Sequence, residues 1–233
     1  MHFRLSVKAS FIALVYAFLI GSLPLAHDAA SRPLPVQSPA TCGPHCGSER
    51  WDVKTLSDPH AGSVDLQQRQ VVTVHSLVSI DPPSQLPADN RISPVELTTF
   101  GVQARLIGFK IEGDQDFHLV IADDQSHETM IVEIPNPKCD GVCASRGLQL
   151  ITGARQTFIK QCGNPTATYR RLTKPLEVRI TGVGFFDFAH GQIGRAIHNS
   201  IELHPVLRIE FPDQTDDCAR HVALVSGTEN SSP

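Results

Sequence analysis

Residues 145–162, SRGLQLITGARQTFIKQC, differ in hydrophobic period from the segments on both sides of them. One face of this stretch carries, three to four residues apart, Leu148, Ile151, Ala154, Phe158 and Cys162. That spacing is typical of an amphipathic α-helix. The neighbouring segments alternate or run apolar over short lengths, so the chain is predicted to place one helix among strands.

Five strand-like segments surround the helix. Three precede it, at 102–113, 116–123 and 129–137, and two follow it, at 176–188 and 201–211. The turns EGDQ (112–115) and DQSHE (124–128) separate the first three, and Pro135 and Pro137 end the third. Short runs rich in β-branched and aromatic residues, bounded by Gly, Pro and Asp, are typical of strands.

Three strands, a helix and two strands are the element order of the OB-fold, a small Greek-key barrel. Gly182 and Gly184 suit a strand that bends to close such a barrel. In the last strand, alternation places Glu202 and His204 on a polar face. We therefore predict a mostly β chain whose residues 99–213 form a five-stranded OB-fold-like barrel, with one helix between strands 3 and 4. An open antiparallel sheet with one helix is the alternative.

The 233 residues, 41% hydrophobic and 19% charged, suit one globular domain with extensions. Residues 1–30 carry Arg4 and Lys8 before an apolar run, which predicts a signal peptide and a secreted or periplasmic location without a membrane span after cleavage. Residues 31–98 are predicted to be an extended Cys/Pro-rich lead-in with at most one short strand or helix. Residues 214–233 form a C-terminal tail.

Six cysteines in an exported chain predict disulfides, although Cys42, His45, Cys46 and the later pair Cys139 and Cys143 could instead bind zinc. A continuous helix over 145–161 separates its ends by about 25 Å, so Cys162 cannot reach that later pair. Cys218 or one of the N-terminal pair remains as its partner. We predict the disulfide Cys162–Cys218.

OB-folds bind ligands on the face of strands 2 and 3, between the loops that join strands 1–2 and 4–5. In this chain that face is bounded by residues 112–118 and 190–200. Candidate ligand-binding residues there are His118, His190, Gln192, Asn199 and His204. The predicted function is non-enzymatic binding of an oligosaccharide, peptide or nucleic acid, with no cofactor. The formal net charge of −4 does not favour nucleic acid.

The alternative is a metal-dependent nuclease or phosphodiesterase. Asp114, Asp116 and Glu133 could hold a divalent cation, with His190 as a general acid or base. The architecture resembles that of staphylococcal-type thermonucleases, whose acidic DGD turn corresponds in place to EGDQD (112–116). Their third strand carries a phosphate-neutralising arginine, which TMIVEIP (129–135) lacks. A purely structural domain is the third interpretation.

Several stretches, above all ITGVGFFDFAHGQIGRAIHNSIELHPVLRIEF (180–211), are similar to an uncharacterised family of bacterial secreted OB-fold-like proteins. The resemblance covers roughly residues 49–211. Members read GxAPNGIELHP where this chain has GRAIHNSIELHP (194–205), so His198 is not a family feature and is a poor catalytic candidate. The resemblance implies the fold and export and supplies no reaction.

Overall fold

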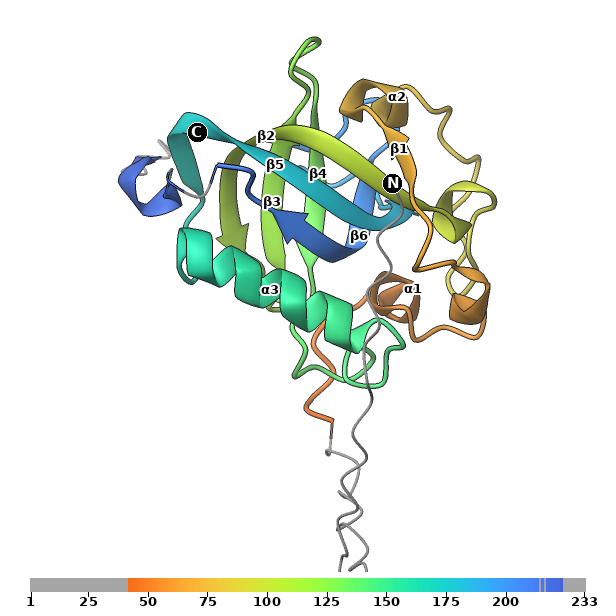
Figure 1. Ribbon diagram of the computed structural model, residues 1–233. Helices are drawn as coiled ribbons and strands as arrows, with labels where there is room; N and C mark the ends of the chain where they lie inside the picture. Colours follow the sequence, from red (N-terminus) through yellow and green to blue (C-terminus); the bar gives the residue numbers. More distant parts are fainter. Residues whose placement is uncertain (1–41, 214, 216, 224–233) are drawn as a thin grey trace, which may run out of the picture. The chain divides into compact units, whose positions relative to one another are not determined.

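The computed structural model describes residues 42–213, 215 and 217–223, so the predicted signal peptide lies outside the described residues. Two short helices and one strand come first: α1 (Trp51–Thr55), β1 (Gln70–Val72) and α2 (Val74–Val78). The main elements follow: β2 (Thr99–Ile111), β3 (Phe117–Ala122), β4 (Thr129–Ile134), α3 (Leu148–Cys162), β5 (Arg170–Phe186) and β6 (Ile201–Glu210). A two-residue strand, β7 (Val222–Ala223), lies near the end (Figure 1).

The strands form one mixed sheet, and the prediction of a mostly β chain is confirmed. Within the described residues the order is β1-β2-β3-β4-β6-β5-β7, and β2 also pairs with β5. Hydrogen bonds therefore run in a ring through β2, β3, β4, β6 and β5. The β1–β2 and β4–β6 pairs are parallel, and the others are antiparallel.

The described residues form seven strands, against five predicted for the barrel: β1 lies in the lead-in, and β7 was not foreseen. The fourth predicted strand also begins earlier, at Arg170 instead of Leu176. Its first residues, RRLTK, pair with the end of β2 and with β7. Most of these side chains are exposed or half-buried and three are charged, so the hydrophobic alternation of a half-buried strand is absent from this part of the sequence.

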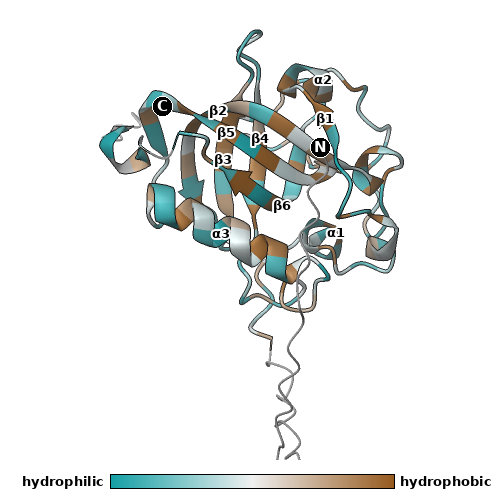
Figure 2. Cartoon of the chain, viewed as in Figure 1, coloured by the Kyte–Doolittle hydropathy of each residue, from teal (hydrophilic) through white to brown (hydrophobic). Residues whose placement is uncertain are grey.

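The helix α3 packs its apolar face against the strands. Phe158, fully buried, contacts the rings of Phe109 and Phe117 at centroid distances of 5.1 and 5.7 Å. Figure 2 shows hydrophobic bands on the strands and a mixture of hydrophobic and hydrophilic residues along α3. The predicted helix is thus present, and its buried residues Ile151, Ala154, Phe158 and Cys162 are the ones that its period indicated.

The second face of β3, β4 and β6 is covered instead of open to solvent. All residues from Ile201 to Leu207 are buried, so the polar face of the last strand, on which Glu202 and His204 lie together as predicted, is enclosed. The 187–200 loop supplies part of the cover. Gly194 adopts a φ of +85° against the Val120 side chain, where a Cβ atom would overlap. Alternation identifies the polar face but does not reveal the layer that covers it.

The N-terminal lead-in supplies the rest of the cover and is more ordered than predicted. It contains two α-helices and a strand, and Trp51, Val53 and Leu77 are buried. Arg50 donates through Nη1 and Nη2 to the two Glu96 carboxylate oxygens, each at 2.7 Å, and both side chains are buried. Helices of five residues are too short to give a period, which explains why the sequence did not reveal them.

Three disulfides join all six cysteines. The predicted Cys162–Cys218 bond is confirmed. Cys42 bonds to Cys143 and Cys46 to Cys139, so no thiolate remains for the zinc site considered from the sequence. Disulfides of this kind form and persist in oxidising compartments. Separately, no helix among the described residues has the length and apolar character to span a bilayer.

Replacing Arg50 with alanine tests whether the lead-in belongs to the fold. The variant leaves the Glu96 carboxylate buried without its cation, and we expect the free energy of unfolding to fall by about 3–5 kcal/mol. Arg208→Ala is the matched control, because the Arg208–Glu210 pair is exposed, and it should cost at most about 1 kcal/mol. Urea unfolding of both variants measures the difference. If both variants lower the free energy of unfolding by equal, small amounts, the lead-in is not an integral part of the fold.

Candidate functional site

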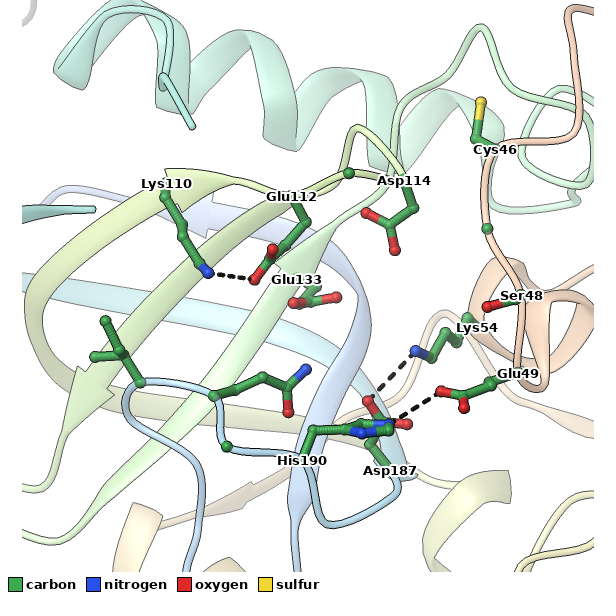
Figure 3. Close-up of a pocket in the computed structure, with 15 residues that line it drawn as sticks. Cys46, Ser48, Glu49, Lys54, Lys110, Glu112, Asp114, Glu133, Asp187 and His190 are labelled. Carbon is green, nitrogen blue, oxygen red and sulfur yellow. Dashed lines mark hydrogen bonds and ion pairs between the residues drawn. The ribbon is translucent and has the colours of Figure 1, made fainter. Parts of the chain in front are cut away.

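A cavity of about 710 Å³ opens between the β2–β3 turn, the 187–193 part of the loop and residues 46–54 (Figure 3). Its lining is strongly charged, and apolar side chains contribute little. The carboxylates that line it are Glu49, Glu112, Asp114, Glu133 and Asp187, and the bases are Lys54, Lys110 and His190. The cavity lies on the face that the sequence indicated, bounded by the two predicted loops, with a third wall from the lead-in.

Backbone hydrogen bonds and α3 hold the β2–β3 turn in place. Asp114 accepts the Asp116 N–H through Oδ1 at 3.1 Å, and Gln115 has a φ of 70°. Arg155 of α3 donates to the carbonyl oxygens of Ile134 at 2.8 Å and Gln115 at 2.9 Å. The carboxylates of the turn therefore face the cavity from a fixed backbone.

Glu133 lies at the floor of the cavity between two histidines. His118 Nδ1 is 2.9 Å from Glu133 Oε1, and His204 Nδ1 is 3.4 Å from Glu133 Oε2. Burial opposes ionisation, but the His118 hydrogen bond and the His204 charge outweigh it and lower the pKa of Glu133 to about 2. Burial likewise opposes the charge on His118, yet the Glu133 hydrogen bond raises its pKa. Glu133 is therefore a fixed anion at neutral pH.

Behind the floor lies a second, fully enclosed group of ionisable side chains. His204 Nε2 is 3.2 Å from Asp116 Oδ2, and His204 Nδ1 is 3.9 Å from Glu202 Oε2. Burial raises the pKa of Asp116 to about 6 and that of Glu202 to about 7. Burial opposes the charge on His204, but these acids raise its pKa to about 10. Neither Glu202 oxygen has a hydrogen-bond partner among the described residues.

Ion pairs cross the mouth of the cavity between the lead-in and the loop. Lys54 Nζ is 3.3 Å from Asp187 Oδ2, and His190 Nε2 is 3.0 Å from Glu49 Oε2, as the dashed lines in Figure 3 show. Burial opposes the charge on Lys54, but Asp187 outweighs it and raises the pKa of the ammonium group. Sequence reasoning missed Lys54, Glu49 and Asp187 as site residues. Lys54 and Asp187 are 133 residues apart, and Glu49 and His190 are 141 residues apart, so no local sequence pattern indicates that either pair is in contact.

The predicted site residues divide into three groups. Asp114, Glu133, His190 and Gln192 line the cavity, and His118 lies directly against Glu133. The remaining three do not line it: Asp116, Asn199 and His204. Asn199 is an anchor for the loop, because its Nδ2 donates to the carbonyl oxygens of Leu77 and Ile80, both at 2.9 Å.

Three clusters within the described residues bring potential metal ligands together. They are Glu49–Asp187–His190, Glu112–His118–Glu133 and Asp116–Glu133–His204, each with ligand atoms within 4.8 Å of one another. The set expected from the sequence, Asp114 with Asp116 and Glu133, is not among them. Asp116 turns its carboxylate toward His204, below the floor of the cavity.

Comparisons with known proteins add little to this geometry. No protein-family model matches the chain, and a search of curated proteins gives no match. A search of solved structures gives a chain provisionally named an aspartyl-tRNA synthetase, from Leishmania major Friedlin, at a TM-score of 0.32 and 16% identity. The match covers 63% of this chain and 21% of that one, and a likeness of this size carries no conclusion.

The buried Glu202 predicts a pH dependence of stability. Its pKa is raised from 4.5 to about 7, so the native state holds a proton that the unfolded state releases between these values. Stability from this group is therefore lost as pH rises through that window. The free energy of unfolding of Glu202→Gln, minus that of wild type, should increase from pH 5 to 7 by at most about 1.4 kcal/mol per unit.

Chemical denaturation at each pH measures this difference, and Glu210→Gln is the control. Glu210 has a side chain 45% exposed on the same strand, so its difference from wild type should stay nearly constant. A flat profile for Glu202→Gln as well would show that Glu202 does not carry a raised pKa in the native state.

Proposed function

We propose that the protein is an exported, OB-fold-like binding protein whose cavity holds a positively charged group of a peptide ligand. Support for the fold comes from the ring order β2-β3-β4-β6-β5, the parallel β4–β6 pair and the place of α3 between β4 and β5. Support for export comes from the three disulfides and from the composition of residues 1–30.

The charge of the residues that line the cavity is the observation on which the proposed class of ligand rests. Five carboxylates face two lysines and one histidine, so the cavity is a site of negative potential. Phosphate groups of nucleic acid are repelled by such a site. An oligosaccharide usually stacks on aromatic rings, and the lining residues include none. A lysine or arginine side chain of a peptide fits best among the three ligand classes considered from the sequence.

The cavity is also preorganised. Glu133 is buried and held by His118, and the Cys46–Cys139 disulfide ties the lead-in wall to the segment that follows β4. A fixed anion with its hydrogen bonds already made does not need to be ordered when a cation arrives. This arrangement supports recognition of one group in one place.

Replacement of a lining carboxylate should weaken peptide binding. We expect Asp114→Asn to lower the affinity for a short lysine- and arginine-rich peptide by about 3–10-fold in calorimetry at low salt. Asp89→Asn, an exposed change outside the cavity lining, is the control and should leave the affinity unchanged. An acidic peptide, a neutral oligosaccharide and a single-stranded oligonucleotide are compared in parallel. Tighter binding of any of these by the wild type would overturn the ligand class.

A metal-dependent phosphodiesterase is the second candidate, and the position of Lys54 favours it. Lys54 lines the same cavity as Glu133 and supplies a cation in place of the arginine missing from the third strand. Under this function, single- or double-stranded nucleic acid is cleaved with a divalent cation and not with chelator, and Lys54→Met lowers the rate. Absence of cleavage with every divalent cation tried would remove this candidate. If neither peptide nor nucleic acid engages the cavity, a structural domain remains.

A further inference from the structure

At the inner end of the cavity, His118 points a ring nitrogen at two carboxylates. His118 Nδ1 is 2.9 Å from Glu133 Oε1 and 3.3 Å from Glu112 Oε1. These residues come from β3, β4 and the turn that follows β2. Both carboxylates line the cavity, and the Glu112 side chain is 26% exposed.

The other ring nitrogen of His118 has a defined partner. Nε2 is 3.0 Å from the carbonyl oxygen of Ile193, which can only accept a hydrogen bond, so Nε2 carries the proton. In the neutral ring, Nδ1 therefore presents a lone pair to two acceptor oxygens. Lys110 Nζ lies 2.9 Å from the same Glu112 oxygen, but no described residue other than His118 itself places a proton donor between Nδ1 and Glu133, so a second proton on Nδ1 or a bound cation must lie there. Histidines that bind metals typically donate their other N–H to a carbonyl in this way.

The distances suit an ion. Nitrogen and oxygen ligands about 2.1 Å from a tetrahedral Zn²⁺ lie about 3.4 Å apart, and less at smaller angles. The distances from His118 Nδ1 to the two carboxylate oxygens, 2.9 and 3.3 Å, are close to this distance between two ligand atoms, so the side chains need to move little to admit the ion. Three protein ligands would leave a coordination position open toward the cavity.

A second observation beside the cluster is a buried carboxyl group whose oxygens lack hydrogen-bond partners among the described residues. Glu202 is 1% exposed, and neither of its carboxylate oxygens has a hydrogen-bond partner among the described residues. It lies behind Glu133, with His204 Nδ1 between them at 3.9 Å from Glu202 Oε2 and 3.4 Å from Glu133 Oε2. The polar groups behind Glu133 are therefore incompletely paired in the structure.

We propose that Glu112, His118 and Glu133 form a binding site for a divalent transition-metal ion of the Zn²⁺ class. The mixed nitrogen and oxygen ligands favour Zn²⁺ over Ca²⁺, which prefers oxygen alone. This inference deepens the proposed function, on which it rests for the assignment of the cavity as the ligand site. It also differs from the metal set expected from the sequence, because Glu112 and His118 replace Asp114 and Asp116.

Metal binding by the full, disulfide-bonded chain without an affinity tag tests the proposal. The protein is stripped with chelator and titrated with Zn²⁺ and, separately, Ca²⁺, by calorimetry and by metal analysis after gel filtration. We expect one equivalent of Zn²⁺ and weaker or no binding of Ca²⁺. Nitrogen NMR of the histidine side chains should show the His118 Nδ1 resonance shifting on Zn²⁺ addition. Failure to bind Zn²⁺, with His118 left as an imidazolium, would overturn the proposal.

Two matched variants locate the ion. Glu112→Gln changes a partly exposed ligand with little risk to folding and should weaken Zn²⁺ binding by at least about 10-fold. Glu49→Gln alters the separate Glu49–Asp187–His190 cluster and should leave the affinity unchanged. The reverse result would place the ion at the mouth of the cavity and refute the proposed site.

Peptide binding measured in chelator separates the two proposals. If the basic peptide binds and Zn²⁺ does not, the proposed function stands and the metal site is wrong. If Zn²⁺ binds and the Glu112→Gln variant binds it more weakly, the metal site stands. If the peptide then fails to bind both in chelator and in the presence of Zn²⁺, the peptide ligand class is wrong.

Discussion

The bidentate pair between Arg50 and Glu96 determines where the covering layer meets the sheet. Glu96 also accepts the backbone N–H groups of Phe186 at 2.9 Å and Ile92 at 2.7 Å, and Arg50 donates to the carbonyl oxygens of Phe186 and Asn90. Phe186 is the last residue of β5, so the pair fixes the point from which the 187–200 loop departs. One buried interaction thereby joins both ends of the lead-in to the start of the loop, and the lead-in and the loop each supply residues that line the cavity.

Enclosing ionisable groups costs free energy, and the chain encloses several. Asp116, Glu202 and His204 are all at or below 1% exposure, and their ion pairs are long or incompletely hydrogen-bonded. Three disulfides offset such a cost, since each typically contributes about 2–4 kcal/mol. An apolar cluster in the same place would be as easy to bury and more stable. The charged cluster is therefore weak evidence for stability of the fold.

The sequence predicts the sheet and α3 well because both depend on periods that a single chain displays. The length of α3 excluded Cys139 and Cys143 as partners of Cys162, and Cys218 was chosen over the N-terminal cysteines, as the structure confirms. The covering layer could not be predicted in the same way. Five-residue helices carry no period, and the partners Lys54 and Asp187 are far apart in the chain. Alternation placed Glu202 and His204 correctly on one polar face, but it could not show that this face is buried.

The same limit applies to the candidate site. The two loops that bound the cavity could be located because the order of strands and helix matches that of the OB-fold. Glu133, His118 and His190 were then named because they lie on the adjoining strands or in one of these loops. The role of each could not be assigned, because it depends on which neighbour the other segments bring. Asn199 illustrates this, since its amide is taken up by the backbone of α2 instead of the cavity.

The Cys46–Cys139 bond makes the shape of the cavity conditional on redox state. Cys46 is itself one of the lining residues, and the segment between Cys42 and Glu49 has no helix or strand of its own. Neither Cys46 nor Cys139 lies in a strand, so this bond closes a wall of the cavity without being part of the ring of strands. Reduction of this bond and of Cys42–Cys143 would remove the covalent attachment of the wall.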